Sequence, residues 1–209
     1  MYTYGICMEG NEASFADAVA ASWRSDFRFV EIGMATAQTT RGIIDQVATL
    51  GSAWRGFTFD LPDGWSMNLE QATTNLGQAI GDVVLTPGQP LNGQDGKVQV
   101  VLQSAAAVLN GPDWTQTIDF AFIDGCHGAA CVMQDFAAVA QHARIGAHIV
   151  FHDTTPSCQG IHLQPHCGTP IAVRAALNTL GLYTNAVPGW LFVTETTAPH
   201  GIAIFRKVA

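Results

Sequence analysis

The chain is poor in charged residues, above all in positively charged ones. Only 12 % of its 209 residues are charged, Lys and Arg together number nine, and the formal net charge is −8. A nucleic-acid surface needs clustered Lys and Arg, and an anionic membrane attracts the same groups. We therefore expect neither a nucleic acid nor a membrane as a partner, and a small or uncharged molecule as the ligand.

The five cysteines form no disulfide pattern. Their number is odd, their spacing is irregular, and no two of them stand in a C-x-x-C arrangement. This argues against a small secreted domain and favours a reducing compartment. Cys158, His162, His166 and Cys167 could form a zinc site. Their spacing matches no usual finger or ribbon pattern, so a loop that happens to hold them is the favoured interpretation.

Long apolar runs are also absent. Residues 1–15 lack a basic region followed by an apolar stretch, so we expect no signal peptide. No stretch approaches the roughly 18 consecutive apolar residues of a membrane-spanning helix. We therefore expect a cytoplasmic protein.

Apolar residues in total are abundant, at 48 % of the chain. The length supports a large core and fits one domain better than two. We expect a single domain over 1–209, with an N-terminal helix or lid segment at 1–26 and a core at 27–207. The composition, rich in apolar and poor in charged residues, is consistent with a homodimer.

Strand and helix patterns alternate along the core. Apolar runs typical of strands lie at 27–33, 56–60, 97–104, 117–125 and 147–153. Segments with helical spacing follow them at 36–51, 68–81, 105–111, 128–143 and 169–181. The last two expected strands, 190–195 and 201–207, are separated only by a short loop. A further helix is expected to begin at Ser14 as N-cap, with Asp17 three residues on.

This order predicts an α/β fold with a Rossmann-like, doubly wound, seven-stranded sheet. The sheet should be mostly parallel, with a C-terminal antiparallel hairpin and helices on both faces.

Polar residues follow two of the expected strands. "FIDGCH" ends in Asp124 and His127, and "FHD" ends in His152 and Asp153. Ligands of open α/β sheets bind outside the carboxyl ends of the strands. If the two strands are neighbours, these groups converge on one crevice.

The stretch "VEIGMATAQTT" is a strand-to-helix turn that contains Glu31 and a single glycine, Gly33. A glycine here allows a positive φ or a close approach of the backbone to a ligand, although an ordinary tight turn explains it as well. Asp60 ends the next strand, where a carboxylate can accept hydrogen bonds from ribose hydroxyls. Together these residues indicate a ligand that contains adenosine. The absence of G-x-G-x-x-G argues against a dinucleotide oxidoreductase.

The segment 119–154 resembles the corresponding part of class I S-adenosylmethionine-dependent methyltransferases. Small-molecule O-methyltransferases and relatives of the cephalosporin-hydroxylase type are the most similar subgroup. That family has a strand ending in I-D-G-x-H, a helix with an acidic residue and a strand ending in H-D-T. "VEIGMATAQTT" is similar to its first motif, E-x-G-x-x-x-G-x-S/T, with Ala37 in place of the second Gly. Gln103 stands where an acidic residue is common.

The resemblance covers roughly residues 27–207 and implies methyl transfer from S-adenosylmethionine to an oxygen of a small molecule, such as a sugar or natural product. It also implies roles for matching residues. Glu31, Gly33 and Ala35 would lie against the methionine end of the cofactor, Asp60 would hold the ribose, Ser104 would lie near the adenine, Asp124 would lie between cofactor and substrate, and His127 would face the acceptor.

Two chemistries remain open for the groups after the fourth and fifth expected strands. Asp124 and Asp153, together with His152, could hold a divalent ion, since oxygen ligands suit Mg²⁺ and an imidazole suits a transition metal. Alternatively, His127 or His152 could act as a general base. A structural role is the third option, because an Asp can cap the next helix and a His can satisfy backbone carbonyls.

Three kinds of function are therefore compared. The first is the methyltransferase, with His127, His152 and Asp153 as catalytic candidates. The second is an inactive binding or scaffold protein with the same fold, suggested by Ala37 and Gln103. The third is a dinucleotide-dependent oxidoreductase.

Overall fold

The computed structural model describes residues 10–51, 53–62, 68–84, 89–155, 170–198 and 200–209. Within these residues the strands form one sheet in the order β3-β4-β2-β1-β5-β6-β8-β7. The strands are β1 (Phe27–Ile32), β2 (Trp54–Phe59), β3 (Ile80–Val84), β4 (Lys97–Val101), β5 (Ile118–Ile123), β6 (Ala143–His152), β7 (Trp190–Glu195) and β8 (Ile202–Lys207). The α-helices are α1 (Glu12–Ser22), α2 (Gln38–Leu50), α3 (Leu69–Leu76), α4 (Ala105–Leu109), α5 (Ala129–Ala140) and α6 (Pro170–Thr179).

The sheet is doubly wound, as the sequence predicted. Strands β3, β4, β2, β1, β5 and β6 are parallel, while β8 pairs antiparallel with both β6 and β7. The chain leaves β1 toward β2 and later returns to the other side of β1 with β5. Connections that diverge from neighbouring strands open a crevice at the carboxyl ends of those strands. The crevice is therefore expected between the ends of β1 and β5.

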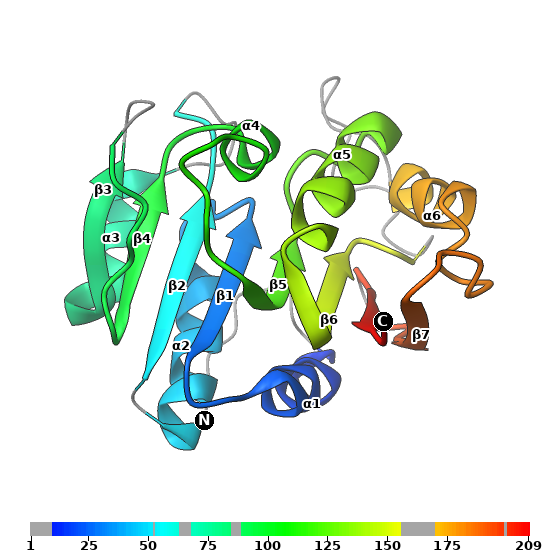
Figure 1. Cartoon of the computed structure of the whole chain (residues 1–209), viewed down its shortest axis with the longest axis horizontal. Coiled ribbons are helices and arrows are strands. Elements are labelled where there is room, and N and C mark those ends of the chain that lie inside the picture. Colours follow the sequence, from blue (N-terminus) through cyan, green and yellow to red (C-terminus); the bar gives the residue numbers. More distant parts are fainter. Residues whose placement is uncertain (1–9, 52, 63–67, 85–88, 156–169, 199) are drawn as a thin grey trace.

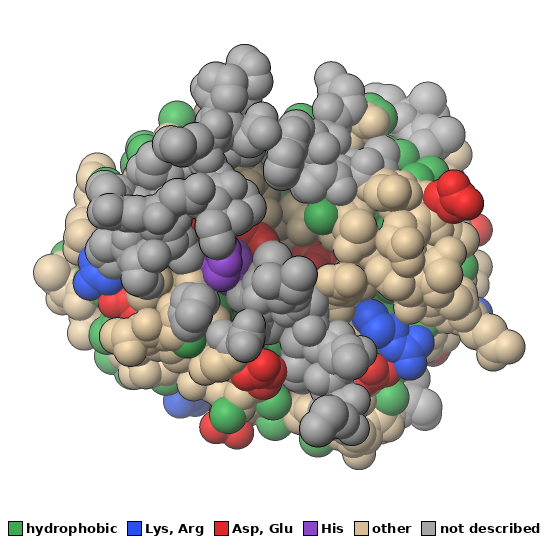
Figure 2. Space-filling model, turned by 180° about the vertical axis from the view of Figure 1, so that it is seen from behind, with side chains coloured by type: hydrophobic (Ala, Val, Ile, Leu, Met, Phe, Trp, Pro, Cys, Tyr) green, Lys and Arg blue, Asp and Glu red, His purple; other side chains and the backbone are tan. Residues whose placement is uncertain are grey.

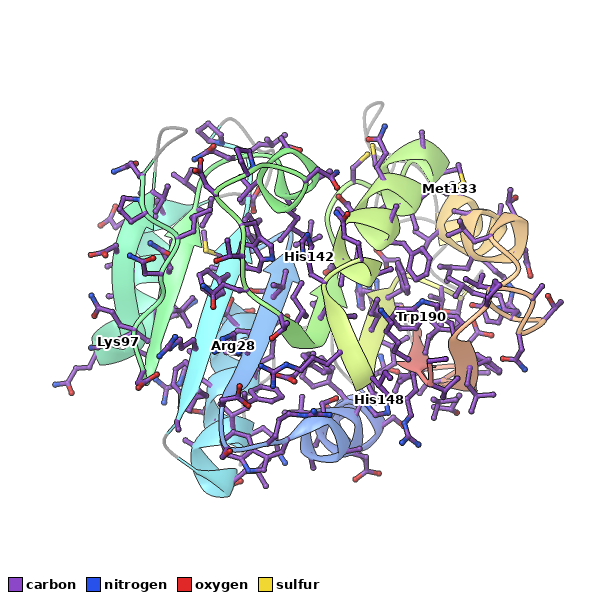
Figure 3. The ribbon with its side chains drawn as sticks, in the orientation of Figure 1. Arg28, Lys97, Met133, His142, His148 and Trp190 are labelled. Atoms are coloured by element: carbon purple, nitrogen blue, oxygen red, sulfur yellow. The ribbon has the colours of Figure 1, made fainter. Side chains whose placement is uncertain are left out.

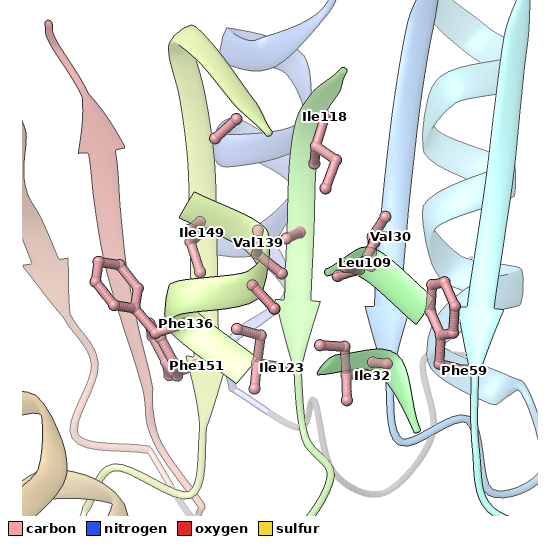
Figure 4. Close-up of a cluster of buried hydrophobic side chains, with 14 of the residues drawn as sticks. Val30, Ile32, Phe59, Leu109, Ile118, Ile123, Phe136, Val139, Ile149 and Phe151 are labelled. Carbon is pink, nitrogen blue, oxygen red and sulfur yellow. The ribbon is translucent and has the colours of Figure 1, made fainter. Parts of the chain in front are cut away.

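Helices cover both faces of the sheet (Figure 1). Helices α1, α2 and α3 pack on one face, and α4, α5 and α6 pack on the other. Strand β5 is buried along its whole length, because Phe120 and Phe122 face α1 while Ala121 and Ile123 face α5. Figure 4 shows the second of these layers, where Phe136 and Val139 of α5 lie over Ile149 and Phe151 of β6. The apolar runs over β1, β2, β4 and β5 thus correspond to strands that are buried along almost their whole length, whereas β7 at the edge exposes Leu191 and Val193.

Two details differ from the sequence-based expectation. The helix expected over 68–81 ends at Leu76, because Gly77 adopts a left-handed conformation with φ of 54°. A short 3₁₀ turn follows, and Ile80–Val84 then forms β3, so the described residues form a sheet of eight strands where seven were expected. Helix α1 begins at Glu12 after Asn11, and Ser14 is therefore not its N-cap.

Polar contacts connect α1 and three strands near the amino end of the sheet. Asp119 is 1 % exposed, accepts a hydrogen bond of 2.9 Å from the backbone N–H of Arg28, and lies 3.3 Å from Arg24 Nε and 3.5 Å from Arg144 Nη1. His148, labelled beside α1 in Figure 3, places Nδ1 2.7 Å from Ser22 Oγ. These contacts join α1, β1, β5 and β6, and they leave the carboxyl end for chemistry.

In the part of the chain that the structure describes, no helix is long and apolar enough to cross a membrane. Of the predicted N-terminal helix or lid segment at 1–26, residues 1–9 lie outside the described residues and Glu12–Ser22 form α1; the Cys158–Cys167 segment also lies outside the described residues.

Candidate active site

The turn after β1 is bonded to the ends of both neighbouring strands. The Gly33 N–H donates to Phe59 O at 2.9 Å, and the Asp124 N–H donates to Ile32 O at 2.8 Å. Gly33 has a φ of 90°, and a Cβ placed on it would lie 2.2 Å from the carbonyl oxygen of Asp124. Glycine is required here because the backbone after β5 packs directly against the turn.

Two alanines in the same turn adopt a left-handed conformation. Ala35 has a φ of 48° and Ala37 a φ of 59°, a region that costs an ordinary L-residue about 1–2 kcal/mol. The Ala35 N–H donates to Asp60 Oδ2 at 2.8 Å, and Ala35 O accepts from the Asn68 N–H at 3.1 Å. The surrounding contacts hold a strained turn, which is a common property of ligand-binding sites.

Asp60 lies directly after β2 and is half-buried. Its Oδ1 accepts a hydrogen bond of 2.8 Å from the Leu61 N–H, while Oδ2 accepts the Ala35 N–H. Each carboxylate oxygen has two lone pairs, so both can accept a further donor. The contact with ribose hydroxyls stays a prediction.

Glu31 is fully buried on the side of β1 that faces α2. Its Oε2 accepts hydrogen bonds from Thr58 Oγ1 at 2.8 Å and from Thr40 Oγ1, while Oε1 has no partner among the described residues. Burial raises the pKa of this carboxyl group to about 8, against the lowering effect of the two threonines. The predicted contact of Glu31 with a cofactor is not tested by these contacts.

Two carboxylates and three imidazoles meet after β5 and β6. His127 Nε2 lies 3.4 Å from Asp124 Oδ1 and 3.1 Å from Asp153 Oδ2. His152 Nδ1 lies 3.0 Å from Asp124 Oδ1 and 3.5 Å from Asp153 Oδ1. His200 Nδ1 lies 2.9 Å from Asp153 Oδ1. The structure thus brings together all four residues that the strand ends predicted and adds His200 to them.

The charges in this cluster compensate one another. Burial alone would raise the pKa of Asp124, but His152 and His127 lower it below its ordinary value. Burial alone would lower the pKa of His152 and of His127, yet the two carboxylates raise it, in His152 well above 6.5. The pKa of Asp153 is likewise lowered by His152 against the effect of burial. The carboxylates of Asp124 and Asp153 thus favour the charged form of His127 and His152, and these imidazoles favour the charged form of the carboxylates.

His200 gave no signal in the sequence, because it stands in the short turn between the last two strands. The antiparallel pairing of His152 with Ile202 carries that turn to the end of β6. The rings of His152 and His200 then stack with centroids 5.5 Å apart and planes inclined by 13°. Only the register of β8 against β6 could have identified this residue.

Ser104, the residue predicted to lie near the adenine, stands at the start of α4. It is exposed, its Oγ accepts a hydrogen bond from the Ala107 N–H at 3.4 Å, and it caps α4. It also borders a surface pocket between α4 and α5 that includes Asn110 and Gln134. Its predicted place near an adenine stays untested.

The cluster is open to solvent on one side. The side chains of Asp124 and His127 are 18 % and 14 % exposed, whereas those of His152 and Asp153 are 2 % and 3 % exposed. In the space-filling view of Figure 2, a histidine lies beside acidic side chains that are set back in a hollow. His127 Nδ1 is buried and has no hydrogen-bond partner among the described residues. A bound molecule can therefore reach Asp124 and His127 before the other members.

The profile of a family described as "Methyltransferase domain" matches residues 30–154, from the second half of β1 to the end of β6. No curated protein matches the chain.

Three similar solved structures span nearly the whole chain. The O-methyltransferase TomG from Streptomyces achromogenes, in complex with SAM, is 14 % identical with a TM-score of 0.63, covering 99 % of this chain and 82 % of TomG. The O-methyltransferase from Bacillus cereus in complex with SAH is 15 % identical with a TM-score of 0.62, covering 98 % and 83 %. Cofactor-bound Rv0187 from MTB is 18 % identical with a TM-score of 0.64, covering 98 % and 82 %. At these identities the likeness shows a shared fold.

Proposed function

Since this chain belongs to the methyltransferase-domain family, as its resemblance to class I S-adenosylmethionine-dependent methyltransferases predicted, we propose that it transfers the methyl group of S-adenosylmethionine to an oxygen of a small molecule. The observation that carries the proposal is the position of Asp124. Its backbone is bonded to the turn after β1, and its carboxylate contacts His127 and His152. One residue thus links the predicted cofactor side of the crevice to the predicted acceptor side.

The cofactor side consists of the turn after β1 and the end of β2. S-adenosylmethionine, when bound, supplies a methyl group that is already activated by a sulfonium. The strained turn at Gly33 and Ala35 presents backbone to the methionine end, and Asp60 retains lone pairs for two ribose hydroxyls. The exposed Ser104 would lie at the adenine end.

The acceptor side has to position a hydroxyl and remove its proton, because the sulfonium needs no further activation. His127 is better placed for this than His152, since its side chain is 14 % exposed whereas that of His152 is 2 % exposed. His152 then holds the Asp124 carboxylate, and Asp153 orients the His127 ring through Nε2. An imidazole in contact with carboxylates is suited to proton transfer near neutral pH.

The same side of the crevice also fits a divalent cation. Asp124 and Asp153 are the residues that would hold it, because their carboxylates converge on His127 Nε2 and stay ionised. A bound cation would supply Lewis acidity that lowers the pKa of an acceptor hydroxyl. The sequence suggested Mg²⁺ at this position, whereas the three imidazoles beside the carboxylates favour a transition-metal ion.

A small acceptor, such as a sugar or natural product, agrees with the charge of the chain. Nine Lys and Arg residues in a chain of net charge −8 disfavour a polynucleotide or an anionic membrane. A cytoplasmic location and a homodimer belong to the same proposal.

Calorimetry with S-adenosylmethionine, S-adenosylhomocysteine and NAD⁺ tests the proposal. We expect micromolar binding of the first two and none of NAD⁺, followed by turnover with hydroxylated small molecules. Binding without turnover, or no binding at all, would favour the inactive scaffold that Ala37 suggested. Preference for NAD⁺ would favour an oxidoreductase.

A further inference from the structure

The cluster after β5 and β6 is richer in nitrogen ligands than a magnesium site. Mg²⁺ prefers oxygen ligands and keeps several waters. Imidazole nitrogens suit transition-metal ions and Zn²⁺. Here Asp124 and Asp153 are accompanied by His127, His152 and His200, so the donor set of the described residues combines oxygen with nitrogen.

The spacing of three of these atoms fits a single ion. His127 Nε2 lies 3.4 Å from Asp124 Oδ1 and 3.1 Å from Asp153 Oδ2, and each of the three residues offers one ligand atom within 4.8 Å of those of the other two. Ligand atoms that sit about 2.0–2.2 Å from one ion lie roughly 3.0–3.5 Å apart. The three side chains can therefore bind an ion with little movement.

The two remaining imidazoles, of His152 and His200, each contact one of the two carboxylates. His152 Nδ1 contacts Asp124 Oδ1 at 3.0 Å, and His200 Nδ1 contacts Asp153 Oδ1 at 2.9 Å. Both histidines are buried, at 2 % and 8 % exposure. Partners of this kind fix the orientation of metal ligands and tune their affinity. Because Asp124 and His127 lie on the open side of the cluster, an ion held by them would be accessible from the crevice.

We propose that Asp124, His127 and Asp153 bind one divalent ion of the Zn²⁺, Co²⁺ or Mn²⁺ type in preference to Mg²⁺, with His127 Nε2 as the nitrogen ligand. His152 and His200 are positioning residues for the two carboxylates. The role of the ion in the reaction rests on the proposed methyl transfer, whereas its binding does not. When the ion is bound, Nε2 of His127 cannot also accept a proton, so the proton-accepting role proposed above belongs to the chain without the ion.

The test begins with full-length protein freed of metal by a chelator. Cys158→Ser and Cys167→Ser are introduced as a background, because these cysteines and the nearby histidines are other candidate ligands in the sequence. Calorimetry then measures the binding of Zn²⁺, Co²⁺, Mn²⁺ and Mg²⁺ to this background and to variants of it. Nearly every protein site prefers Zn²⁺ to Mg²⁺, so the decisive comparison is between variants.

The variants distinguish the loss of the nitrogen ligand from a general disturbance of the fold. His127→Ala should weaken Zn²⁺ and Co²⁺ binding about 10- to 100-fold, as losses at metal sites do, and change Mg²⁺ binding little. His127→Asp should create a set of three carboxylates and strengthen Mg²⁺ binding relative to Co²⁺ binding. His142→Gln is the matched control, because this histidine lies 2.8 Å from Leu109 O, away from the cluster, and should leave all affinities unchanged.

A spectroscopic signature identifies the ligand directly. Pulsed EPR of the Mn²⁺-loaded protein should show coupling to an imidazole nitrogen that disappears in His127→Ala. Unchanged Zn²⁺ and Co²⁺ affinity in His127→Ala, or a Mn²⁺ spectrum without nitrogen coupling, would overturn the inference. S-adenosylmethionine binding is measured on the same samples, so loss of the ion site with intact cofactor binding refutes this inference alone, and the reverse refutes the proposed function alone.

Discussion

Replacing Glu31 by Gln should remove a pH dependence from the stability of the fold. Burial raises the pKa of Glu31 from 4.5 to about 8, so the folded chain keeps this proton up to that pH. The unfolded chain loses the same proton near the ordinary pKa. Between these two values the folded state binds more protons than the unfolded state, and the free energy of unfolding therefore falls as pH rises.

The magnitude follows from the width of this window. A gap of about 3.5 pH units at 1.36 kcal/mol each sets an upper bound near 5 kcal/mol, and we expect on the order of 3–5 kcal/mol. Glu31→Gln does not titrate and keeps an acceptor oxygen for Thr40 and Thr58. The stability of the variant relative to the wild type should therefore increase from pH 5 to pH 8 and stay level above pH 8.

Urea unfolding at a series of pH values measures this difference. Glu70→Gln, at an exposed position in the first turn of α3, is the control and should run parallel to the wild type. The reasoning is refuted if the Glu31→Gln and wild-type curves are also parallel between pH 5 and 8. In that case the buried carboxyl group would be ionised in the folded chain.

Four further outcomes are expected. Asp60→Ala should weaken S-adenosylmethionine binding by about 1–3 kcal/mol in calorimetry, and unchanged affinity would remove the ribose role. Asp153→Ala should abolish metal-dependent turnover while S-adenosylmethionine affinity stays within about threefold of the wild type, because the variant loses a ligand of the ion and no cofactor contact. Metal dependence retained in kinetic assays would contradict the proposed ligand set. Ala35→Gly should raise the free energy of unfolding by about 0.5–1 kcal/mol, since glycine relieves the left-handed φ at some cost in unfolded-state entropy; chemical denaturation that shows a loss would contradict this. Burial and, to a smaller extent, the charge of Arg206 lower the pKa of His148 to about 4. The free energy of unfolding should therefore fall by up to about 3 kcal/mol as pH drops from 6.5 to 4. His148→Gln should reduce that loss in unfolding curves measured at acid pH.

The sheet could largely be predicted from the sequence, because both of its faces are covered. Buried parallel strands appear as continuous apolar runs, and the run over β5 is one of them. The missed strand, β3, illustrates the limit. The helical spacing of apolar residues in α3 continues past Leu76 to Ile80, the first residue of β3. The helix nevertheless ends at Leu76, because Gly77 has a positive φ. One backbone angle is not visible in a periodicity.

The candidate site was predictable where it depends on strand ends. Asp124 and Asp153 meet because β5 and β6 are parallel neighbours, with Ile123 opposite Phe151. His200 was not predictable, because its place depends on the antiparallel register of β8, which no local pattern specifies. The positive φ of Ala37 could not be predicted from the residue type, and its place at the second glycine of the similar motif was the signal available for it.

The closed amino end of the sheet, where Asp119 lies among Arg24, Arg28 and Arg144, has a consequence for how such a protein can change over time. The contacts that join α1, β1, β5 and β6 lie at the opposite end of the strands from the groups proposed to react. Substitutions in the loops around the crevice can then alter acceptor choice while these stabilising contacts remain intact. A lineage with this layout can explore new substrates by small steps without first acquiring compensating mutations for folding.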